Sequence, residues 1–131
     1  HENSSAASDV YKRQHKKSLH FYKKGHILAL LDKPYENFVR EQQDLLIAIF
    51  SSTKIDNGEE VFKTIRYSSN NDLSSEFEEM SDLKMIIIFG NISCDFDFKD
   101  EQIIAPKLSL LLANKDSKKE LWLQIKQKLN I

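Results

Sequence analysis

The sequence predicts an α/β fold: a small three-layer, Rossmann-like sheet of four or five mostly parallel strands that ends in a C-terminal helix hairpin. Short apolar runs of strand length alternate with helical patterns, an order that implies right-handed crossover connections. Residues 85–89 are five consecutive apolar residues, which is typical of a strand buried on both faces at the centre of a parallel sheet. Two helical patterns follow in direct succession from residue 106 onward.

The first half of the chain contains two strand patterns separated by a helical pattern. Residues 27–31 form an apolar run between Gly25 and an Asp-Lys-Pro turn, so we expect a buried strand there. Residues 61–67 are rich in β-branched and aromatic side chains, which favours a second strand. Between them, residues 36–50 carry an apolar face at helical spacing, formed by Leu45, Leu46, Ile49 and Phe50.

The middle of the chain adds a short helix and two further strands. Residues 70–72 supply a helix cap. The apolar face of the helix that follows is predicted from three residues at helical spacing, Leu73, Phe77 and Met80. Residues 92–98 alternate between apolar and polar, and residues 102–105 form another short run, so each predicts a strand.

The chain is predicted to end in a helix hairpin. The first helix is expected to open at Pro106, because proline is favoured at the first helical position, and to stop at residues 113–114. The second helix is expected to begin with a capping box formed by Ser117 and Glu120. An apolar stripe then predicts that Trp122, the only tryptophan of the chain, faces inward together with Leu121, Ile125 and Leu129.

This C-terminal stretch resembles the signature of the psi subunit of DNA polymerase III, a non-catalytic accessory protein of the bacterial clamp loader. It covers roughly a sixth of the chain in one ungapped run, and the tryptophan is its most specific element. The residues that carry the resemblance are Pro106, Leu108, Leu111, Ala113, Asn114, Lys118, Leu121, Trp122, Gln124 and Ile125.

The resemblance implies a compact α/β fold of the predicted kind and a role without chemistry or a cofactor. Members of the psi family hold the clamp loader through an N-terminal segment and bind the chi subunit, which in turn contacts single-stranded-DNA-binding protein. We therefore expect a non-catalytic accessory subunit of the bacterial DNA polymerase III holoenzyme in the cytoplasm. Its signature residues are expected to build a scaffold, with no catalytic, cofactor-binding or metal-binding residues.

The first 24 residues are expected to be a disordered tail in front of one domain, residues 25–131. Residues 1–14 are polar and without periodicity, and they look like translated sequencing-adapter read-through, an artefact that should carry no function. The basic and aromatic segment that follows offers Leu19, Phe21 and Tyr22 as anchors for a protein partner. The same segment could instead contact a nucleic-acid backbone or remain a solvated tail.

Composition narrows the classes of protein. With 131 residues, 40% of them apolar and 30% charged, the chain has room for one globular domain. The net charge of −1 provides no global field toward nucleic acid, and no apolar run is long enough for a membrane span. The single Cys94 and the four histidines show no metal-ligand spacing, and one cysteine cannot form an internal disulfide.

Two alternatives from other classes remain open. Asp95, Asp97, Asp100 and Glu101 could hold Mg²⁺ in a small nucleotide- or nucleic-acid-processing enzyme with a Rossmann-like fold, although their alternating pattern also suits a solvated face. Gly90, after the predicted central strand, lies where α/β folds bind ligands, so an effector-binding domain is the other alternative. A turn that needs a small residue explains Gly90 equally well.

Overall fold

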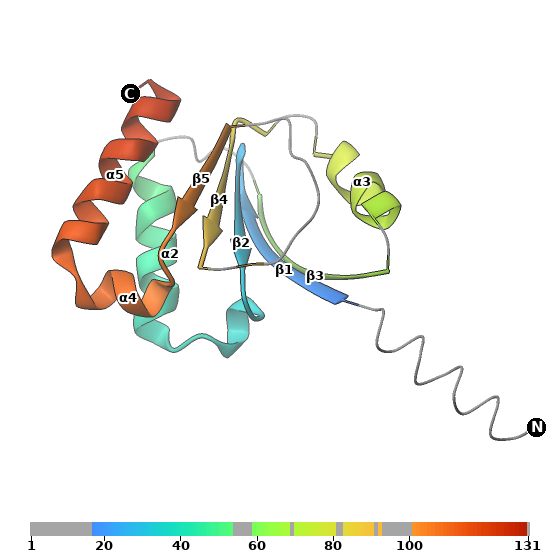
Figure 1. Cartoon of the computed structure of the whole chain (residues 1–131), viewed down its shortest axis with the longest axis horizontal. Helices are drawn as coiled ribbons and strands as arrows, with labels where there is room; N and C mark the ends of the chain where they lie inside the picture. The colour runs from blue at the N-terminus through green and yellow to red at the C-terminus, as the bar shows by residue number, and fades with distance from the viewer. Residues whose placement is uncertain are drawn as a thin grey trace, which may run out of the picture.

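The computed structural model describes residues 17–53, 59–68, 70–80, 83–90, 92 and 101–130. Within these residues a five-stranded sheet has the order β3-β1-β2-β4-β5 and carries helices on both faces (Figure 1). The strands are β1 (Lys17–Lys24), β2 (Ile27–Leu31), β3 (Glu60–Tyr67), β4 (Met85–Phe89) and β5 (Glu101–Ala105). The helical elements are the 3₁₀ helix η1 (Tyr35–Asn37), α2 (Arg40–Ser52), α3 (Asn70–Glu78), α4 (Leu108–Ala113) and α5 (Lys115–Leu129).

β1 lies inside the sheet, which corrects the expectation that the tail extends to residue 24. Leu19, Phe21 and Tyr22 are at most 1% exposed, so they are core residues and not the anchors of a free partner-binding tail. A two-residue turn joins β1 to β2, because Lys24 is the register partner of Ile27. Gly25 has a φ of 60° at the first turn position, as a type II′ hairpin requires.

The sheet is mixed, which corrects the expectation of mostly parallel strands. β1 pairs antiparallel with both β2 and β3, whereas β2 with β4 and β4 with β5 are parallel pairs. The physical reason is the tight turn at Gly25, because a two-residue loop can join only antiparallel strands. β1 therefore occupies the place beside β2, and the chain that leaves α2 adds β3 to the far edge of β1.

Each face of the sheet packs its own apolar cluster. The face covered by α2, α4 and α5 includes Ile27, Ala29 and Leu31, and the opposite face, covered by α3, includes Leu28 and Leu30 (Figure 1). All five residues of β2 are buried because this strand has helices on both sides. The three-layer arrangement predicted from the sequence is thus present around a mixed sheet.

Several predicted elements have nearly the observed bounds. The apolar runs 27–31 and 85–89 are β2 and β4, and the strands predicted at 61–67 and 102–105 each begin one residue earlier in the structure. The predicted strand at 92–98 lies almost entirely outside the described residues. None of the helices in the described ranges combines the length and the apolar character that a membrane crossing needs.

Candidate functional site

The first helix of the C-terminal pair begins two residues later than the sequence predicts. α4 starts at Leu108 with Lys107 as its N-cap residue, so Pro106 precedes the helix. Leu108 and Leu111 are buried against the core cluster, whereas Leu110 is 58% exposed. One apolar side of α4 thus faces the sheet and helix α2, and the opposite side of α4 is exposed to solvent.

The second helix is capped by Asn114 and not by the predicted Ser117. The Asn114 side-chain oxygen Oδ1 accepts a hydrogen bond from the backbone N–H of Ser117, with 3.1 Å between the two atoms. This satisfies one of the N–H groups that the first turn of any helix leaves without an intrahelical partner. Asn130, with a φ of 59°, ends the helix in the left-handed conformation typical of a C-cap.

The ten signature residues occupy three environments. Leu108, Leu111, Leu121 and Ile125 are buried in the cluster beneath α2, α4 and α5. Ala113 and Asn114 are exposed at the junction of the two helices. The remaining members are half-buried, namely Pro106, Lys118, Trp122 and Gln124. Trp122 therefore packs against the edge of the core, which differs from the fully inward position that its apolar stripe predicts.

A groove of about 290 Å³ runs between α2 and α5 beside Trp122. Its α4–α5 side is formed by Leu111, Lys118, Leu121, Trp122 and Ile125, all of which belong to the signature stretch. Its α2 side is formed by Leu45, Ala48, Ile49 and Ser52. The groove is lined mainly by apolar side chains, so its chemistry suits apolar groups of a binding partner.

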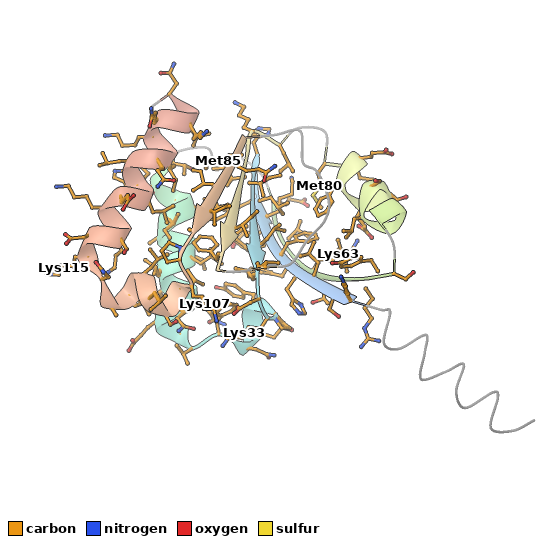
Figure 2. The ribbon with its side chains drawn as sticks, in the orientation of Figure 1. Lys33, Lys63, Met80, Met85, Lys107 and Lys115 are labelled. Carbon is orange, nitrogen blue, oxygen red and sulfur yellow. The ribbon has the colours of Figure 1, made fainter. Side chains whose placement is uncertain are left out.

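Several lysines share one face of α5 with Trp122. Lys115, Lys119, Trp122 and Lys126 follow one another at intervals of four, three and four residues, which places them on one helix face. The Lys126 Nζ lies 5.9 Å from the centre of the Trp122 ring, within the range of a cation–π contact. Figure 2 shows Lys115 at the start of α5, on the side away from the sheet.

An aromatic cluster stands on the same face of the sheet at the β1–β3 edge. The Tyr22 ring centre is 4.9 Å from those of Phe50 and Phe62 and 5.8 Å from that of Tyr35. The Tyr22 hydroxyl donates a hydrogen bond to the Glu60 carboxylate at 2.8 Å. Burial, followed by this bond, raises the pKa of Tyr22 well above its usual value. The cluster fastens η1 and α2 to the sheet.

The carboxyl ends of β2 and β4 leave little space for a ligand. The crevice there measures about 50 Å³, and both Lys33 and Lys107 line it (Figure 2). Gly90 has a φ of 91°, and a Cβ atom at this position would lie 2.9 Å from the Lys107 Cγ. The turn and the close approach of Lys107 account for this glycine, so the geometry does not favour the effector-binding alternative.

Of the four acidic residues considered for Mg²⁺, only Glu101 belongs to the described backbone, as the first residue of β5. Asp95, Asp97 and Asp100 lie outside the described residues. Among the residues that are described, no three His, Cys, Asp or Glu side chains are grouped in a way that could hold a metal ion. A wider polar depression of about 480 Å³ lies between β3 and α3, but it places Arg66 beside Glu76 and Glu79 and mixes both signs of charge.

No known protein family, curated protein or solved structure matches this chain. The groove and the signature residues that line it are therefore the features from which a function can be proposed. The α2 side of the groove was not among the predicted site residues. The helical spacing of Leu45, Ala48 and Ser52 was the available signal, but nothing local indicates that this flank faces α5.

Proposed function

We propose that this chain is a non-catalytic, psi-like accessory subunit of the bacterial DNA polymerase III holoenzyme in the cytoplasm. In this role it links the clamp loader to a chi subunit, and through chi to single-stranded-DNA-binding protein. One observation carries the proposal: five members of the signature stretch come together along a single groove on the outside of the domain.

The chemistry of that groove supports binding over catalysis. Ser52 and Lys118 are the polar residues among its lining, and they do not form a set of convergent acids, bases or nucleophiles. Small-molecule sites usually combine an apolar pocket with several placed polar groups. An apolar groove between two helices is instead typical of a surface that receives side chains of another protein.

A connector of this kind acts through effective concentration. Holding two weakly interacting partners on one rigid body makes their second contact intramolecular, which strengthens the whole assembly without new chemistry. Because β1 takes residues 17–24 into the sheet, the clamp-loader contact is proposed for the folded body or for residues ahead of Lys17.

The proposal is tested by binding measurements on the full chain. The chain is immobilised, and chi subunits, clamp-loader subunits and single-stranded-DNA-binding proteins from several bacterial lineages are passed over it one at a time. We expect chi and a clamp-loader subunit to bind separately, and single-stranded-DNA-binding protein to bind only when chi is present. Absence of binding to every chi and clamp-loader subunit at micromolar concentrations, with circular dichroism showing a folded chain, would overturn the proposal.

A further inference from the structure

We propose that the groove between α2 and α5 binds an acidic amphipathic helix of a partner protein. This inference rests on the proposed function, since it assigns the surface through which the connector holds a partner. It adds the chemical character of the segment that binds there, which the resemblance to the psi family does not supply.

The floor and walls of the groove fit the apolar face of a helix. Leu45, Ile49 and Trp122 are half-buried, so they already pack against the core and still present surface along the groove. The lining residues of α5 run from Lys118 to Ile125, about 10 Å along the helix axis at 1.5 Å per residue. This length matches roughly two turns of a partner helix, whose apolar residues would recur every three or four positions.

The positive charge of three lysines on α5, Lys115, Lys118 and Lys119, favours an acidic partner. Lys115, Lys118 and Lys119 make no ion pair in the part of the chain that the structure describes, and all lie within one helical turn or two of Trp122. The acids of α5, Asp116 and Glu120, are four residues apart and fall on another face of the helix. Carboxylates flanking the apolar face of a partner would therefore meet unpaired lysines.

The α2 rim adds little opposing charge. Arg40 and Asp44 pair with each other at 3.9 Å, and the α2 residues that line the groove are uncharged. Glu41 lies on the same flank one turn before Leu45, outside the lining. The groove thus presents positive charge on the α5 side and near neutrality on the α2 side. A basic helix would be repelled, whereas an acidic helix would be attracted and oriented.

Two other occupants fit less well. A second copy would have to offer an acidic helix with an exposed apolar face. The acidic face of α5, with Asp116 and Glu120, presents only Leu123, which is 55% exposed, and the apolar residues of the acidic helix α3, Leu73 and Phe77, are buried in the core. An anionic lipid surface would satisfy the lysines. It is flat, however, and the apolar residues here line a recess between two helices. Both occupants are therefore outcomes that the test must separate.

Trp122 makes the test direct, because it is the only tryptophan of the chain and it lines the groove. Its fluorescence is followed while the full chain is titrated with synthetic helical peptides of about 14 residues, roughly four turns. The first peptide has leucines on one face and glutamates elsewhere, the second has the same composition with the leucines dispersed, and the third has lysines in place of the glutamates. We expect a saturable blue shift with the first peptide only, and weaker binding as salt is added.

Variants on the groove identify the binding surface. Lys119→Glu with Lys126→Glu should weaken binding of the first peptide about tenfold or more, since charge complementarity becomes repulsion. Ala48→Glu, a change at an exposed position of the groove lining, should weaken it as well without disturbing the fold. Lys17→Glu with Lys84→Glu changes the net charge equally at exposed positions outside the groove lining, and it should leave the affinity within about twofold.

Each remaining result contradicts the inference in a recognisable way. If the peptide with dispersed leucines binds as tightly as the first peptide, or if the groove variants keep the original affinity, the groove does not bind an amphipathic helix. A Trp122 shift with phosphatidylglycerol vesicles but not with the peptide indicates a lipid surface. A concentration-dependent dimer in sedimentation velocity that Ala48→Glu dissociates indicates a second copy.

The same variants distinguish this inference from the proposed function. If chi or a clamp-loader subunit binds the groove variants as tightly as the original chain, the proposed function stands and the groove inference fails. If the acidic peptide binds in the groove while no replicase subunit binds the chain, the groove inference stands and the proposed function fails.

Discussion

At the scale of single residues, Tyr22 of β1 contacts three other segments of the chain at the β1–β3 edge. Its ring contacts Tyr35 of η1, Phe50 of α2 and Phe62 of β3, and its hydroxyl donates to Glu60. Contacts of this kind hold together elements that are distant in the sequence. Tyr22, which the sequence predicts as an anchor for a partner protein, therefore holds β1, β3, η1 and α2 of its own chain together.

Tyr22→Phe tests how much the hydroxyl contributes. The variant keeps the ring packing and loses the hydrogen bond to Glu60, so we expect a loss of about 1 kcal/mol in the free energy of unfolding at neutral pH. Urea titration followed by circular dichroism provides the measurement. Tyr35→Phe is the matched control, because its ring also stacks in the cluster while its hydroxyl makes no hydrogen bond to any residue that the structure describes. Its effect should stay below about 0.5 kcal/mol.

The same tyrosine predicts a loss of stability in alkali. Burial and Glu60 raise the pKa of Tyr22, and burial likewise raises the pKa of Tyr35, so the folded chain keeps protons that the unfolded chain releases. This contribution to stability is complete below the usual tyrosine pKa of about 10 and declines as the pH rises above it. The free energy of unfolding of Tyr22→Phe should therefore decline less steeply above about pH 10 than that of the original chain. Parallel curves for the two proteins would contradict the role assigned to burial.

At the level of elements, the junction of α4 and α5 depends on one cap. Asn114→Ala removes the oxygen that accepts from the Ser117 N–H, so the first turn of α5 loses a hydrogen bond and the protein should lose about 1 kcal/mol of stability. Thermal unfolding followed by circular dichroism would measure the change.

Ser117→Ala separates this cap from the capping box that the sequence predicts. The Ser117 backbone N–H still reaches Asn114 in that variant, so we expect a change smaller than about 0.5 kcal/mol. If Ser117→Ala lowers the stability more than Asn114→Ala does, the helix begins with the capping box of Ser117 and Glu120 and not with the Asn114 cap.

Elements with a strong local pattern could be predicted, and β1 could not. β2 and β4 are continuous apolar runs, and their bounds follow directly from the sequence. β1 mixes buried Leu19 and Phe21 with lysines at both ends, so it lacks such a run. Its burial depends on β3, and the bond from Tyr22 to Glu60 joins residues 38 positions apart. A contact between residues so far apart in the chain cannot be predicted from the pattern of apolar and polar residues within one segment.

One side of the groove could be predicted from the sequence, and the other side could not. The α4–α5 side of the groove coincides with residues that the signature stretch marks, because they belong to one continuous segment. The α2 side comes from residues at least 59 positions earlier in the chain, from Ser52 to Leu111, and only the packing of the helices makes them neighbours. Spacing identified an apolar face on each helix, but it could not tell where those faces meet.

For the whole molecule, strand direction was the feature that local patterns could not supply. Alternating strands and helices favour parallel neighbours, and the β2–β4 and β4–β5 pairs agree with that rule. The hairpin at Gly25 places β1 between β2 and β3 and makes both of its pairings antiparallel. One short turn thus changes the order of the sheet, while the layers on its two faces remain as predicted.

The two faces of this sheet should unfold together. Leu73 of α3 is fully buried on one face, whereas Trp122 reports on the helices of the other. β1, β2 and β4 contribute side chains to both clusters, so the loss of one cluster removes support from the other. Leu73→Ala should lower the free energy of unfolding by about 2–5 kcal/mol. In urea titrations of this variant, the midpoint followed by Trp122 fluorescence should fall by as much as the midpoint followed by circular dichroism. A fluorescence midpoint that stays at its original value while the helical signal falls earlier would show that α3 unfolds on its own.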